Sequence, residues 1–199
     1  MGKSSDLVMQ IHYHPSGKAT KDRSKVGIYF VDKPKNEAFA VWTSSFDLDI
    51  PPDEANYEAK ASYKLPTELT MLSCIPHMHL LGQEMTVTAK LPDGSTKQLI
   101  HVPQWDFNWQ DEYMYSEPFT LPAGTVLNVV ARYDNSTNNP SNPSYPPERV
   151  TFGEQTTDEM LYCFFLVAVD DPKLVPVVAG DSLTHEAIRR AAHRLKGGR

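Results

Sequence analysis

The chain has 199 residues, 40% of them apolar, and this length and composition predict one substantial core with at most a piece of a second domain. The net charge is −6 and no basic stripe runs along the chain, so a nucleic-acid partner is not expected. No apolar run is long enough to cross a bilayer, and the first ten residues lack the apolar centre of a signal peptide. We therefore expect no membrane partner.

Sixteen prolines and many short β-branched segments predict strands joined by turns rather than helices. Two strands are expected at the start of the chain, Leu7–Tyr13 and Val26–Val31. Seven more follow: Glu37–Thr43, Glu58–Tyr63, Leu69–His79, Met85–Lys90, Lys97–Val102, Thr125–Tyr133 and Glu159–Val169. Short strands at this spacing predict an all-β fold, an antiparallel β-sandwich of jelly-roll type.

The last third of the chain contains a loop signal and a helix signal. Residues 135–147 are mostly turn formers and predict a long polar loop without a packing face. The loop begins with an Asn-Ser-Thr glycosylation triplet at Asn135, but a plain polar loop is the simpler interpretation. A short helix is predicted after a cap at Asp181 or Ser182, and a docked or frayed terminus fits it better than a membrane-surface helix.

Two histidines stand at alternating positions in the segment TMLSCIPHMHLLG. In a strand, His77 and His79 would share one face and could clamp a transition metal, although two half-exposed strand histidines are an alternative. Met160, in TFGEQTTDEMLYCFF, is either core filler or a third ligand. Two imidazoles and a thioether form a soft, neutral set that favours Cu(I), whereas zinc prefers a carboxylate or thiolate in the third place.

These segments resemble the copper type II, ascorbate-dependent monooxygenase family, which includes peptidylglycine α-hydroxylating and dopamine β-monooxygenases. HMHLLG is similar to the family's HTHHLG, and GEQTTDEM is similar to its GGTSSDEM. LPAGTVLNVVARYDNS and IPPDEANYEAKASYKLP stand in corresponding places, so the resemblance reaches about Val169. It implies that residues 35–175 form the C-terminal copper domain, that 1–34 are the last strands of a missing N-terminal domain, and that 176–199 are a tail with a short helix.

The resemblance also implies an activity. His77, His79 and Met160 match the ligands of the copper at which a C–H bond is hydroxylated with dioxygen, ascorbate being the reductant. His12, in LVMQIHYHPSG, matches one ligand of a second, electron-supplying copper in the family's LVLQVHYG. Because its other ligands belong to the preceding domain, we expect slow turnover or none from this chain alone. His14 replaces a glycine and is a supplementary ligand or a solvated side chain. The family is periplasmic or secreted, which is the location we expect.

The substrate is expected to differ from that of the peptide-hydroxylating members. Those proteins hold the substrate carboxylate with an arginine, an asparagine and a tyrosine. The corresponding positions here are Ile75, Tyr162 and Phe164. Without the guanidinium there is no bidentate carboxylate clamp, so a glycine-extended peptide is not expected, and a small-molecule or other non-carboxylate substrate is.

Two other functions compete with this interpretation. The chain could be a non-catalytic copper-binding or structural domain of a larger protein. It could also be a cupin-type mononuclear metal enzyme, because HMHLLGQE satisfies HxHx4E with Glu84 as the third ligand. The cupin pattern breaks at Leu127, where its last histidine belongs, and at Met71, which replaces its first glycine.

Cys74 and Cys163 are the only two cysteines. If the histidine and methionine strands are antiparallel neighbours with Met160 opposite His77, then Cys163 lies opposite Cys74. The odd spacing from the ligands turns both sulfurs to the face away from copper. A cross-strand disulfide, a pair of buried thiols and two unrelated core cysteines all remain open.

Overall fold

The computed structural model describes residues 6–9, 11, 13, 16–32 and 36–180, and the chain divides into two compact units, Met1–Lys33 and Pro34–Arg199. No strand forms among the described residues of the first unit, so the predicted strands Leu7–Tyr13 and Val26–Val31 are not found there. Many apolar side chains in these ranges are exposed, including Tyr29 at 98%. The physical reason is that a β-ladder needs a hydrogen-bonding partner, and a propensity for strand does not supply one.

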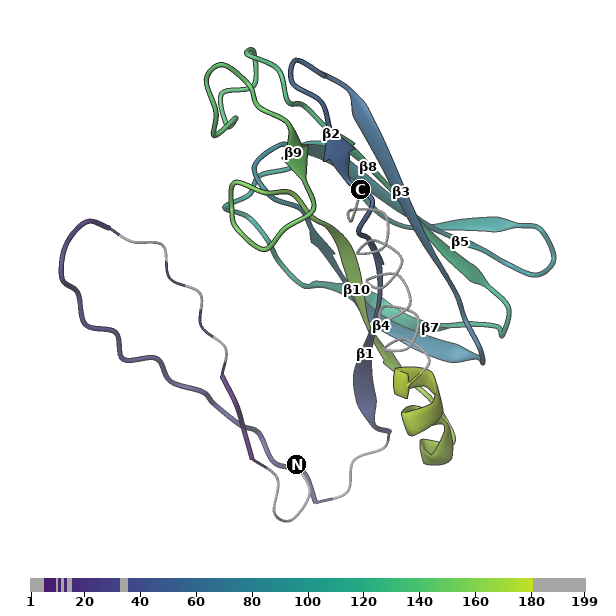
Figure 1. The fold of residues 1–199 in the computed structure, drawn as a ribbon. Helices are drawn as coiled ribbons and strands as arrows, with labels where there is room; N and C mark the ends of the chain where they lie inside the picture. The colour runs from purple at the N-terminus through teal and green to yellow at the C-terminus, as the bar shows by residue number, and fades with distance from the viewer. Residues whose placement is uncertain (1–5, 10, 12, 14–15, 33–35, 181–199) are drawn as a thin grey trace. The chain divides into compact units, whose positions relative to one another are not determined.

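The described part of the second unit contains ten strands (Figure 1). They are β1 (Ala38–Ser45), β2 (Asp49–Ile50), β3 (Tyr57–Lys64), β4 (Leu69–His77), β5 (Gly82–Lys90), β6 (Thr96–Val102), β7 (Tyr113–Leu121), β8 (Val126–Tyr133), β9 (Val150–Thr151) and β10 (Leu161–Ala168). The seven strands predicted after residue 35 are therefore confirmed, with shifted ends. β2, β7 and β9 were not predicted.

β7 escaped prediction because Glu117 and Pro118 interrupt its apolar pattern. Proline is tolerated because β7 is an edge strand, whose outer backbone groups bond to no further strand. Its alternating Tyr113, Tyr115 and Phe119 were the available signal, since all three are less exposed than their neighbours in the chain.

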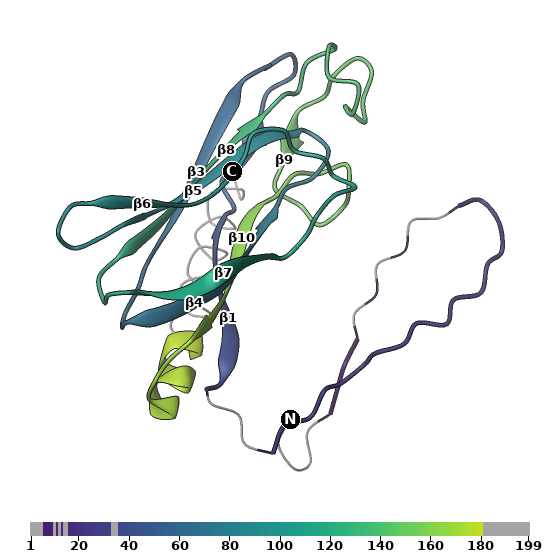
Figure 2. The ribbon, with the colours of Figure 1, turned by 180° about the vertical axis from the view of Figure 1, so that it is seen from behind.

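Two antiparallel sheets, ordered β1-β10-β4-β7 and β3-β8-β5-β6, make up the sandwich, and β2 pairs with β9 beside them. The eight long strands follow the order of a jelly roll, in which the first strand, β1, pairs with the last, β10. Figures 1 and 2 show the two layers from opposite sides. The predicted fold class is confirmed.

The core lies between the two sheets, where alternate residues of each strand point inward. In β3, Ala59, Ala61 and Tyr63 are buried while their neighbours are exposed, as period-two patterning requires. The opposite sheet contributes large inward side chains such as Met71 and Phe165. This packing fixes the positions of the central strands β4 and β10, at whose ends the candidate site lies.

The loop after β8 packs more tightly than predicted. Asn135 is fully buried, and its Nδ2 donates to the carbonyl oxygens of Pro51 at 2.9 Å and Glu148 at 2.7 Å. Ser136 and Asn139 are also buried, so the expectation of a loop without a packing face was wrong. An asparagine amide can satisfy backbone carbonyls that no strand reaches, which composition alone does not reveal. The buried amide also removes Asn135 as a glycosylation site in the folded chain.

After β10 the chain forms a 3₁₀ turn, Pro172–Leu174, and residues 175–180 are helical. Helical structure thus begins before the predicted cap, and the predicted helix after Asp181 lies outside the described residues. Within the described part of the chain, no helix has the length and apolar character needed to span a membrane.

Candidate metal centre

The histidine pair lies where β4 ends. His77 is the last residue of β4, and His79 follows it in the connection to β5, so the predicted strand ends two residues early. Met78 between them is fully buried in the core. The two imidazole rings have centroids 5.2 Å apart and are nearly perpendicular, at 87°. The two imidazoles therefore lie on the same side, as predicted for alternate residues of a strand, although His79 lies beyond the end of β4.

Each imidazole is held through its Nδ1 atom by an oxygen. His77 Nδ1 lies 2.6 Å from Gln110 Oε1, and His79 Nδ1 lies 3.1 Å from the carbonyl oxygen of Asp158. Gln110 Nε2 donates to the carbonyl of Phe107 at 2.8 Å, which orients the amide so that its oxygen faces His77. An oxygen acceptor requires Nδ1 to carry the proton, so the lone pair of each neutral ring is on Nε2.

Burial favours the neutral form of His79. The side chain is largely buried, and desolvation lowers its pKa, while the carbonyl and charge of Asp158 act in the opposite direction. A neutral imidazole is the form that binds a metal. The local environment of His79 therefore suits a ligand.

A buried carboxylate joins the histidine segment to the methionine segment. Glu159 is fully buried, and its Oε1 accepts the backbone N–H of His79 at 2.5 Å and that of Met160 at 2.8 Å. Its Oε2 accepts the N–H of Leu81 at 3.0 Å. Desolvation raises the pKa of Glu159 to about 8, and the three N–H donors lower it in part. Glu159 thus holds the two segments side by side.

Met160 lies just before β10 and is half-buried. Its carbonyl accepts the hydroxyl of Tyr133 at 2.9 Å, so its backbone is anchored through both N–H and C=O. The structure thus brings the backbones of Met160 and His79 together at one carboxylate. His12 and His14 lie outside the described residues, and the assignment of all four ligands stays a prediction.

Four residues around the histidines were not predicted as part of the site: Trp105, Phe107, Gln110 and Glu159. Trp105 Nε1 donates to the carbonyl of His79 at 3.0 Å, and the Phe107 ring lies edge-on to His79 with centroids 6.1 Å apart. An acid directly before a candidate methionine ligand was a signal for Glu159. No signal in the sequence pointed to Gln110, because it belongs to a polar loop that only the fold brings to His77.

The register of β4 and β10 differs from the predicted one by two residues. Tyr162, not Met160, pairs with His77, so Cys163 lies opposite Pro76 and Cys74 opposite Phe165. Because the slip is even, each side chain keeps its face, and both sulfurs lie in the core as predicted. The sulfur atoms are 3.3 Å apart, and both cysteines are free thiols.

The three positions that differ from the peptide-hydroxylating pattern lie together beside His77. Ile75 pairs with Phe164 across the two strands, just as His77 pairs with Tyr162. The Tyr162 and Phe164 rings are stacked, with centroids 5.4 Å apart and planes 8° apart. This part of the sheet is therefore apolar and aromatic, without the cationic clamp of that pattern at Ile75.

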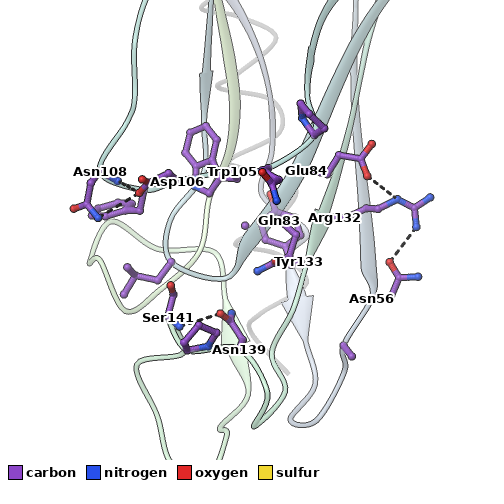
Figure 3. Close-up of a pocket in the computed structure, with 17 residues that line it drawn as sticks. Asn56, Gln83, Glu84, Trp105, Asp106, Asn108, Arg132, Tyr133, Asn139 and Ser141 are labelled. Atoms are coloured by element: carbon purple, nitrogen blue, oxygen red, sulfur yellow. Dashed lines mark hydrogen bonds and ion pairs between the residues drawn. The ribbon is translucent and has the colours of Figure 1, made fainter.

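A polar cavity of about 620 Å³ is lined in part by Leu80, Gly82 and Gln83, which follow His79 in the chain (Figure 3). Trp105 and Phe107, which contact His79, form part of its wall. Its charged lining residues are Glu84, Asp106 and Arg132, which together carry one net negative charge. Arg132 is already paired, since it donates to Asn56 Oδ1 at 3.0 Å and lies 3.2 Å from Glu58. The cavity thus disfavours an anionic ligand.

The structure does not assemble the cupin ligand set. Glu84 Oε1 pairs with His101 Nε2 at 2.9 Å, and its Oε2 lies 3.8 Å from Arg132 Nε. In the described ranges, no three His, Cys, Asp or Glu side chains come together in a way that could hold a metal ion. A His-His-Met set is outside that category because a thioether is not among those ligands.

Comparison of the chain with known protein families and with curated proteins found no match. Solved structures with a similar chain path include that of the infectious bursal disease virus Gx strain, at 8% identity and a TM-score of 0.37, covering 73% of this chain and 38% of the viral one. A crystal structure of the VP2 subviral particle of that virus matches at 8% identity and a TM-score of 0.34, covering 74% and 35%. The matched region is less than two fifths of either viral chain.

Proposed function

We propose that this chain is the copper-binding domain of an ascorbate-dependent monooxygenase, with His77, His79 and Met160 as ligands. The observation that carries the proposal is the pair of imidazoles whose Nδ1 atoms are both held by oxygen acceptors. That arrangement fixes the rings and leaves the Nε2 lone pairs as donors, as a metal-binding histidine requires.

The donor set fits copper better than zinc. Two neutral imidazoles and a thioether provide no negative charge, which suits Cu(I). When bound, copper supplies the one-electron chemistry by which dioxygen delivers one oxygen atom to a substrate C–H bond, with ascorbate as reductant. Gln110 and the Asp158 carbonyl orient the two rings, Glu159 keeps the Met160 segment against the His79 segment, and Phe107 shields one side of His79 from water.

The surroundings support a substrate without a carboxylate. Next to His77 the sheet presents Ile75, Tyr162 and Phe164, where a carboxylate would find no guanidinium in place of Ile75. The polar cavity has a net negative charge, which repels anions. A neutral or cationic small molecule is therefore the substrate class we propose.

Cu(I) binding tests the ligand assignment. The full chain is expected to bind one Cu(I), and X-ray absorption should show nitrogen and sulfur scatterers. Met160→Leu should remove the sulfur signal, while Met114→Leu, at a side chain that is 64% exposed, serves as the matched control and should keep it. A sulfur signal that survives Met160→Leu, or is lost equally in both variants, would show that Met160 is not the ligand.

Oxygen consumption with ascorbate separates an enzyme from a non-catalytic copper-binding domain. We expect slow turnover or none from these 199 residues alone, because they match only one ligand of the family's second copper, His12. Adding an electron-supplying copper domain should raise the rate. A copper-loaded chain that stays inactive in its presence with every neutral or cationic substrate tested would favour the non-catalytic alternative.

A further inference from the structure

The two cysteines are adjacent in the core although 89 positions separate them in the chain. Cys74 is in β4 and Cys163 in β10, the two central strands of one sheet, and both are fully buried. Their sulfur atoms lie 3.3 Å apart. Both point into the core, away from the face that carries His77. The pair is thus separate from the proposed ligand set.

The immediate surroundings of the thiols are partly polar. Thr43 lies opposite Cys163 on β1, and its buried hydroxyl has no hydrogen-bond partner among the described residues. The Tyr115 side chain is close enough that burial and the two neighbouring cysteines raise the pKa of its hydroxyl. Burial and Cys74 also raise the pKa of the Cys163 thiol. The thiolate of Cys163 is therefore rare in the folded chain, and oxidation there is slow.

We propose that Cys74 and Cys163 form a disulfide that covalently joins β4 to β10 beneath the candidate metal centre. The sulfurs must approach from 3.3 Å to about 2.05 Å, the length of a disulfide bond. The two residues are diagonal rather than directly opposite neighbours, so closing the bond requires a small shift of the strands. The irregularity between Leu166 and Val167 interrupts the β4–β10 ladder nearby and gives it room to adjust.

The chemistry is thiol–disulfide exchange with a small-molecule or protein disulfide. One cysteine, as its thiolate, attacks a sulfur of the oxidant and forms a mixed disulfide with that half of the oxidant. The other half leaves as a thiol. The second cysteine then attacks the mixed disulfide, forms the Cys74–Cys163 bond and releases the second thiol. The chain loses two electrons and two protons, and the oxidant disulfide gains them. Because the folded core excludes the oxidant, the bond forms during folding and is then protected from reductants.

The experiment uses the full chain, unfolded and reduced, then refolded with oxidised and reduced glutathione in the presence of a chelator. We expect both thiols to disappear from titration in denaturant, a chain two hydrogen atoms lighter, and one cross-linked peptide containing Cys74 and Cys163. The thermal midpoint of the oxidised chain should exceed that of the reduced chain. Unfolding the oxidised chain, reducing it with dithiothreitol and refolding it should abolish this difference. The double variant Cys74→Ala, Cys163→Ala should show no response to oxidant.

Two free thiols after refolding, a glutathione adduct on one cysteine, or only an intermolecular dimer would each overturn the proposal. If the double alanine variant does not fold, the peptide map of the wild-type chain still decides. Because the chelator removes copper, this result is independent of the proposed function. The Cu(I) stoichiometry of the oxidised chain, measured separately, is expected to be unchanged, since the sulfurs face away from His77.

Discussion

Removal of the Glu159 carboxyl group is expected to destabilise the metal-free chain strongly. Glu159→Ala leaves the buried N–H groups of His79, Leu81 and Met160 without their acceptor. Each unsatisfied buried donor costs about 1–3 kcal/mol, so we expect a total of about 3–6 kcal/mol after partial access of water. That is a large share of the roughly 5–15 kcal/mol that stabilises a typical domain.

Glu159→Gln should cost less, about 1–3 kcal/mol, because its amide oxygen can replace Oε1 and keep two of the three bonds. Its amide nitrogen would then face the N–H of Leu81, donor against donor. The matched control is Glu117→Gln on the edge strand β7, where the side chain is exposed and the change should stay within about 0.5 kcal/mol.

Urea unfolding of the metal-free variants, followed by intrinsic fluorescence, measures these differences. The order of stability should be wild type and Glu117→Gln, then Glu159→Gln, then Glu159→Ala. If Glu159→Ala unfolds within about 1 kcal/mol of the wild type, the carboxylate does not hold the histidine and methionine segments together as argued. Cu(I) affinity should fall in Glu159→Ala where the chain stays folded, because that variant removes the acceptor that joins His79 to Met160, and should be largely kept in Glu159→Gln, which retains both of those bonds.

Two further predictions concern pH and packing. In the metal-free chain the pKa of Glu159 is raised to about 8, so between about pH 5 and 8 the folded state keeps a proton that the unfolded state releases. The free energy of unfolding should therefore fall as pH rises through this window, by at most about 5 kcal/mol. The wild type should lose stability relative to Glu159→Gln, which has no such proton. The lowered pKa of His79 acts in the opposite direction, because stability is then lost as pH falls below about 6.5, but this effect is common to the wild type and Glu159→Gln. A difference in stability between these two chains that stays constant across the window would contradict the raised pKa of Glu159. Gly82→Ala would place its Cβ 2.8 Å from Trp105 Cδ1 and 3.0 Å from Met78 Cβ, costing about 1–3 kcal/mol in urea unfolding. Gly180→Ala, whose added Cβ would meet no atom of another element within 4 Å among the described residues, should be nearly neutral. Equal stability of the two variants would refute the close approach of Trp105 to Gly82.

Much of the fold could be predicted from the sequence because β-structure leaves a local pattern. Alternating and β-branched residues located β3 and β8 in the sequence, and turn residues marked where strands stop. The same alternation predicted that Cys74 would face away from His77, because an odd spacing reverses the face of a strand. These properties depend on neighbours in the chain and survive any arrangement of the sheets.

Tertiary structure decided how the strands meet. Local pattern does not distinguish a register in which His77 faces Met160 from one in which it faces Tyr162, because an even slip preserves every face. The hydrogen bonds of the site likewise depend on tertiary structure. Gln110 reaches His77, and Glu159 reaches His79 and Leu81, across separations that only the packed sandwich closes. The sequence by itself determined the residue types of the candidate ligands and the strand face of His77, whereas the orientation of these side chains and the clamp between their segments depend on contacts between residues remote in the chain.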